Sequence, residues 1–173
     1  MSEYNFKGIK PESIELLCLN RFNDSKEFYE EHKLELKEGI TVPMRQIVLD
    51  LSGLMYDIDD KMLTDPVRSV SRIYRDTRGN RSKIKYRENM WLMLRRYKKD
   101  MYPDAPKEIK PYLSAKNMEF SYSSFDINRI NSPSLIDELK LAFDLARPMY
   151  SFWADAYDNM LDKGIIKPED AIR

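Results

Sequence analysis

The sequence predicts an α+β fold with N-terminal helices, a central antiparallel sheet and C-terminal helices in a single domain, residues 1–173. Apolar residues recur at helical spacing before residue 58, residues 69–78 alternate with a period of two, further strand-like segments follow up to residue 127, and helical spacing returns after residue 132. Because helices and strands occupy separate parts of the chain, the strands are expected to pair antiparallel rather than through βαβ crossovers.

Three helices are predicted first. Pro11 begins one helix, and Asn23 or Asp24 caps a second, with Glu27 placed as in a capping box. Pro43 starts or kinks a third helix. The apolar stripe of this third helix is predicted to belong to the core: Ile47, Val48, Leu51, Leu54 and Met55.

Four strand-like segments follow. Residues 69–78 and 88–97 are expected to pair as a long hairpin around a basic loop that begins at Gly79. Residues 111–116 and 118–127 are rich in aromatic residues and serine, and they give two more predicted strands.

The C-terminal part is predicted to hold two helices. Ser132 and Pro133 begin the first, Pro148 interrupts it, and Gly164 ends the second. The second helix carries its own apolar stripe from Met149 to Leu161.

The hydrophobic content of 42% suits a globular protein with a full core. Cys18 is the only cysteine, which excludes an internal disulfide, and its place beside Leu17 predicts a buried structural thiol. No signal peptide and no apolar run of membrane length occur, so a cytoplasmic protein without membrane contact is expected.

Residues 68–99 concentrate positive charge. They hold twelve Lys or Arg against two acids, a net charge of +10 in a chain whose total is zero, so the remainder carries −10. Such a concentrated positive field attracts anions, whatever the fold.

Within this segment, strand periodicity places Arg72 and Arg78 on one face, on either side of Asp76. A carboxylate between two guanidinium groups holds their rotamers, and preset arginines bind carboxylate or phosphate through two hydrogen bonds. An Arg–Asp–Arg network that only stiffens the strand is the alternative interpretation.

The same residues carry a resemblance. The pattern R-x-x-R-D-x-R followed by K-x-x-Y resembles the signature of a family called domain of unknown function 2461, and here its residues are Arg72, Arg75, Asp76, Arg78, Lys83 and Tyr86. Similar residues also occur at 6–9 and 22–33, and the chain departs from the family pattern at Gly79 and Ser82.

The resemblance implies a family-like domain that starts near residue 6, with a shortened C-terminal part, and a candidate ligand-binding site at the six signature residues. It carries no established activity, so whether the protein is an enzyme stays open. Lys83 and Tyr86 are the candidates for proton transfer, because neighbouring cations are expected to lower the pKa of each. The alternative is a tyrosine stacked under arginines and a solvated lysine.

No phosphate-binding glycine loop occurs, and His32 is the only histidine, so no cofactor and no metal are expected. Three functions remain, in this order: recognition of a small phosphate- or carboxylate-bearing anion, nucleic-acid binding with tyrosines and tryptophan as stacking platforms, and a structural or protein-interaction module. Cations that converge on one concave pocket would favour the small anion, whereas cations spread along a ridge would favour a polymer.

Overall fold

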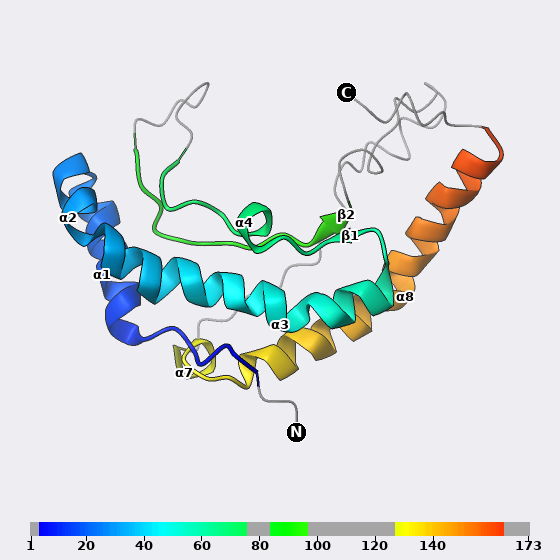
Figure 1. Ribbon diagram of the computed structural model, residues 1–173, viewed down its shortest axis with the longest axis horizontal. Coiled ribbons are helices and arrows are strands. Elements are labelled where there is room, and N and C mark those ends of the chain that lie inside the picture. The colour runs from blue at the N-terminus through cyan, green and yellow to red at the C-terminus, as the bar shows by residue number, and fades with distance from the viewer. Residues whose placement is uncertain (1–3, 76–83, 97–126, 165–173) are drawn as a thin grey trace.

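The long helix α3 (Val42–Ile58) lies between an antiparallel ribbon of extended chain and the C-terminal helices in the computed structural model, which describes residues 4–75, 84–96 and 127–164 (Figure 1). The elements before α3 are α1 (Pro11–Asn23), α2 (Lys26–Leu36) and the π-helical segment η1 (Lys37–Thr41). Those after it are β1 (Met62–Leu63), α4 (Pro66–Ser69), β2 (Arg95–Arg96), α7 (Ile127–Ile130) and α8 (Leu135–Asp162). In the described ranges, no helix is long and apolar enough to cross a membrane.

The predicted α+β fold with a central antiparallel sheet is wrong, because the described chain is mostly helical. Over residues 4–75, 84–96 and 127–164, regular strand pairing is limited to two residue pairs, Met62 with Arg96 and Leu63 with Arg95. The predicted strand 111–116 and most of 118–127 lie outside the described residues, and Ile127 begins α7.

The predicted pairing of the two charged segments does occur, as a ribbon made of residues 69–75 and 84–96. Antiparallel bridges join Val70 to Leu92 and Tyr74 to Tyr86. Tyr74 lies four positions after Val70, whereas Leu92 lies six positions after Tyr86. The second segment therefore contains two extra residues, which form a bulge. The bulge interrupts the ladder of hydrogen bonds, which explains why the ribbon is not a continuous sheet.

A serine satisfies the backbone of this bulge. The N–H of Trp91 donates to Oγ of Ser71 at 3.0 Å, and the carbonyl of Trp91 accepts from the N–H of Ser71 at 2.9 Å. Side chains alternate with a period of two, so an insertion of two residues leaves the two faces of the ribbon unchanged. The bulge therefore bends the ribbon without exchanging its buried and exposed sides.

The first two helices form as predicted, but the cap of the second is different. Ser25 caps α2, and its Oγ accepts from the N–H of Phe28 at 3.0 Å. Asp24 instead ends α1 in the left-handed conformation at φ 46°, where its N–H donates to the carbonyl of Asn20 at 3.1 Å. The carboxylate of Asp24 is thereby available for a contact elsewhere.

The helical chain continues from α2 through η1 into α3, with Pro43 in the first turn of α3. The predicted core stripe is confirmed for Ile47, Val48, Leu51 and Met55, which are buried, whereas Leu54 is half-buried. Gly39 in η1 permits close contact with α1, because a Cβ at this position would lie 2.3 Å from Oγ and 2.8 Å from Cβ of Ser13.

The predicted break at Pro148 is wrong: α8 is a single helix of 28 residues that contains this proline and changes direction along its length (Figure 1). A proline removes one helical hydrogen bond and bends the helix, while the turns on both sides remain bonded. Gly164, at φ 64°, follows the end of α8. Met149, Phe152 and Trp153 from the predicted second stripe are exposed.

The core joins the ribbon to the helices. Buried residues from the N-terminal segment, the three first helices, the ribbon and the start of α8 form one cluster, which includes Phe6, Leu36, Ile40, Leu51, Val70, Ile73, Tyr86 and Ile136. The buried side chains of the ribbon are consequently part of the core.

Cys18 is exposed, so its predicted burial is wrong.

We expect Gly39→Ala to destabilise the protein and Gly53→Ala to stabilise it. Both glycines lie in helical backbone, where alanine is favoured by up to about 1 kcal/mol. A Cβ at position 53 meets nothing within 4 Å, whereas at position 39 it overlaps Ser13. Overpacking of this kind costs about 1–3 kcal/mol. Urea unfolding of both variants measures the difference, and equal stabilisation by both would contradict the close packing of η1 on α1.

Candidate functional site

The two faces of the ribbon differ in burial. Ser71 and Ile73 are buried, whereas Arg72 and Tyr74 are exposed. In the second segment, Tyr86 is buried and the side chains of Met90, Leu92 and Leu94 pack against the core, whereas Trp91 and Met93 are exposed. The ribbon therefore directs some of its side chains into the core and leaves others exposed.

A groove of about 490 Å³ lies on the outer face. Four arginines, two aromatic residues, three aliphatic residues and a serine line it: Arg68, Arg72, Arg87, Arg95, Tyr74, Trp91, Leu63, Val67, Val70 and Ser71. No acidic residue is among these lining residues. Cations from α4 and from both segments of the ribbon thus meet in one concavity.

The four arginines differ in how far the protein neutralises them. Nε of Arg68 lies 3.7 Å from a carboxylate oxygen of Asp65. The guanidinium of Arg87 lies 5.9 Å from the ring centroid of Trp91, and its buried Nε has no hydrogen-bond partner. Arg72 and Arg95 form neither a hydrogen bond nor an ion pair with the part of the chain that the structure describes. The groove is therefore incompletely neutralised.

The structure separates the described members of the predicted site. Arg72 lines the groove, whereas Arg75 and Tyr86 lie on the inner side of the ribbon. Asp76, Arg78 and Lys83 lie outside the described residues. The predicted grouping of Arg72 and Arg78 around Asp76 stays a prediction.

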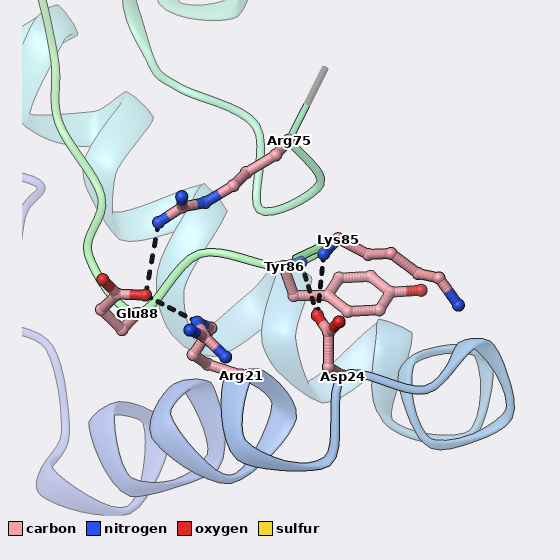
Figure 2. Close-up of polar contacts among 6 residues, drawn as sticks. All are labelled: Arg21, Asp24, Arg75, Lys85, Tyr86 and Glu88. Carbon is pink, nitrogen blue, oxygen red and sulfur yellow. Dashed lines mark hydrogen bonds and ion pairs between the residues drawn. The ribbon is translucent and has the colours of Figure 1, made fainter. Parts of the chain in front are cut away.

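Arg75 belongs to an ion-pair bridge between the ribbon and α1. Oε2 of Glu88 lies 3.3 Å from a guanidinium nitrogen of Arg75 and accepts from Nε of Arg21 at 2.8 Å (Figure 2). One carboxylate thus joins both segments of the ribbon to the last turn of α1. The hydrogen bond from Arg21 is the main reason that the pKa of Glu88 lies below its ordinary value, and the charge of Arg75 adds to this shift.

Asp24 makes the second link between α1 and the ribbon. Its Oδ1 accepts from the backbone N–H groups of Lys85 at 2.8 Å and of Tyr86 at 3.0 Å (Figure 2). The left-handed backbone at the end of α1 places this carboxylate beside the ribbon. Asp24 therefore holds the ribbon at the point where its second segment begins.

Tyr86 is a packing residue in this structure. Its side chain is 1% exposed, stacks on Tyr29 at 4.8 Å between centroids and meets Tyr74 edge to face at 5.6 Å. Burial, followed by the nearby Tyr29, raises the pKa of Tyr86, so the predicted lowering by surrounding cations is wrong. A phenol with a raised pKa remains protonated at neutral pH, which disfavours a role as a general base.

The groove contains residues that the sequence did not single out, namely Arg68, Arg87 and Arg95. A signal for two of them was present, because Arg87, Trp91 and Arg95 are spaced four residues apart and a strand places such residues on one face. Arg68 gave no such signal, since it comes from the short helix α4. Over the described ranges, no cluster of His, Cys, Asp or Glu could hold a metal ion.

Substitutions of Asp24 should destabilise the protein in the order Asn, Gly, Ala, with Ala the most severe. Asn keeps an acceptor oxygen and tolerates the left-handed conformation, Gly keeps only the conformation, and Ala keeps neither. We expect Asp24→Ala to cost about 2–4 kcal/mol, because hydrogen bonds to a charged acceptor and left-handed strain both contribute. Denaturant unfolding tests the order, with the exposed Asp57→Ala as a control near zero. Equal effects of Asn and Ala would contradict the proposed link.

Glu88→Gln should lower the melting temperature at pH 7 but not in acid. The folded-state pKa of Glu88 is lowered, so its contribution is fully present above the ordinary value of 4.5 and disappears as the pH falls through the folded-state pKa. Melting curves of the parent and the variant should converge as the pH falls through the folded-state pKa of Glu88. The exposed Glu35→Gln is the control, for which no such convergence is expected. A constant difference across this pH range would rule out an ionic contribution from Glu88.

Comparison with known proteins agrees with the resemblance seen in the signature residues. No curated protein and no solved structure matches the chain. A family model described as "Conserved hypothetical protein (DUF2461)" matches residues 12–111, which is more than half of the chain and includes α1, the ribbon and the groove. The chain belongs to this family, domain of unknown function 2461.

Proposed function

We propose that the protein binds a small anionic ligand that carries phosphate or carboxylate, in the groove on the outer face of the ribbon. The observation that supports this function is the meeting of four arginines in one concavity, with no acidic residue among the lining residues that the structure describes. Like charges held together repel one another, so a bound anion would relieve the repulsion as well as form hydrogen bonds.

The groove suits a ligand of limited size. Its volume of about 490 Å³ falls in the range of small-molecule sites, roughly 300–1,000 Å³. Arg68 and Arg72 lie on one stretch of backbone and Arg95 lies on the stretch paired with it, so the cations meet across the ribbon instead of following one segment. The charge of −10 on the rest of the chain also disfavours a long polyanion.

The backbone beneath the arginines is fixed. Val70 and Ser71, which line the groove, are buried, and Ser71 is bonded to Trp91 across the ribbon. A rigid floor keeps the arginine side chains near one another before a ligand arrives, which lowers the entropy lost on binding. Arg72 and Arg95 have guanidinium groups available for a ligand, because they make no ion pair within the described ranges.

The double variant Arg72→Ala/Arg95→Ala should lose anion binding while it remains folded. Calorimetric titration with pyrophosphate and with citrate would measure the affinities. A charge-assisted hydrogen bond contributes about 1.5–3 kcal/mol, so the loss of two arginines should weaken binding by at least roughly tenfold. Arg72→Lys should retain part of the affinity, because lysine keeps the charge but not the two-pronged geometry.

Arg147→Ala is the matched control for this experiment. Arg147 is paired with Asp144 on α8 at 2.7 Å and does not line the groove. We expect the control to bind both anions as the parent does. Equal affinity in the parent and the double variant, or no binding by the parent at millimolar concentration, would refute the proposed site.

A further inference from the structure

The groove also presents an aromatic ring whose backbone is held in place. Trp91 lies in the bulge of the ribbon, and both its N–H and its carbonyl are bonded to Ser71. Its side chain is 43% exposed and lines the groove. A large apolar ring in this position is available to contact whatever occupies the groove.

One face of this ring is already occupied. The guanidinium of Arg87 lies 5.9 Å from the ring centroid, which is within the range of a cation–π interaction. A planar ligand group would therefore stack on the other face of Trp91. Tyr74, 47% exposed and also lining the groove, is a second ring available to such a ligand.

Aromatic rings and unpaired guanidinium groups in one groove match a ligand that joins a planar ring to an anion. Nucleobases stack on aromatic side chains, and phosphates accept two parallel hydrogen bonds from arginine. On the basis of the function proposed above, we infer that the ligand is a mononucleotide, with its base stacked on Trp91 and its phosphate bound by Arg72 and Arg95. Side chains bind the phosphate here, in place of the backbone N–H groups of a glycine-rich loop.

A mononucleotide fits these observations better than a nucleic-acid strand does. Single-strand binders align several aromatic platforms along a basic track. Tyr86, one of the rings that the sequence offered for this purpose, is buried against Tyr29 and cannot stack on a ligand. Two rings and one groove of about 490 Å³ suit a single base with its phosphate.

The fluorescence of Trp91 provides a direct test. The chain contains two tryptophans, so Trp153→Phe, on α8, leaves Trp91 as the only one. We expect AMP and ATP to quench this fluorescence as they bind. AMP should bind roughly 5- to 100-fold more tightly than ribose 5-phosphate, which has the same phosphate and sugar but no base.

Substitution of Trp91 separates stacking from phosphate binding. In Trp91→Ala, measured by calorimetry, AMP should bind no more tightly than ribose 5-phosphate, while the affinity for ribose 5-phosphate stays as in the parent. Trp91→Phe should recover part of the preference for AMP, since phenylalanine also stacks. A melting curve of each variant confirms that it is folded.

The outcomes separate the nucleotide inference from the proposed anion site. Equal affinity of the parent for AMP and ribose 5-phosphate, with both lost in Arg72→Ala/Arg95→Ala, would overturn the nucleotide inference and leave the anion site standing. No binding of pyrophosphate, AMP or ribose 5-phosphate would overturn both. Binding of a single-stranded oligonucleotide far more tightly than AMP, with a steep dependence on salt, would replace the mononucleotide by a nucleic-acid strand.

Discussion

The attachment of the ribbon to the helices is the constraint on which the rest of this structure depends. A two-stranded ribbon alone is at best marginally stable in water. Here Val70, Ile73 and Tyr86 of the ribbon are buried in the same core as the helices. Asp24 and the Arg21–Glu88–Arg75 bridge then join the same ribbon to the end of α1. The side chains of Arg72 and Arg95 instead line the groove, without an ion pair in the described ranges.

The bulge connects the packing of the ribbon to the candidate site. Two extra residues bend the second segment but preserve its alternation, so Trp91 remains on the outer face with Arg72. Oγ of Ser71 satisfies the N–H of Trp91, which in a regular ladder would donate to the backbone carbonyl of Ser71. The feature that prevents a continuous sheet is therefore also the feature that presents an aromatic ring beside the arginines.

The two sides of the ribbon divide the charged residues by role. On the inner side, Arg75 is neutralised by Glu88, and the nearby Tyr86 is a buried packing residue. On the outer side, Arg72 and Arg95 line a groove that contains no acid. The family match over residues 12–111 includes the links to α1 as well as the groove. Arg75 and Tyr86 thus attach the ribbon to the helices, whereas Arg72 and Arg95 line the groove.

Local patterns in the sequence determined the first three helices, the pairing of the two charged segments and the concentration of positive charge in residues 68–99. Helical periodicity, Pro11 and the stripe of α3 act within a few residues of one another, so they can be recognised without the fold. Period-two alternation likewise separated Arg72 from the inner side chains of the ribbon. Only the tertiary structure decided which cations meet. Arg68 lines the groove from α4. Asp24 does not cap α2, and its carboxylate instead accepts from the N–H groups of Lys85 and Tyr86. The pKa of Tyr86 follows its burial and not its charged neighbours in sequence. These outcomes depend on contacts between segments far apart in the chain, and no local pattern encodes the distance between such segments.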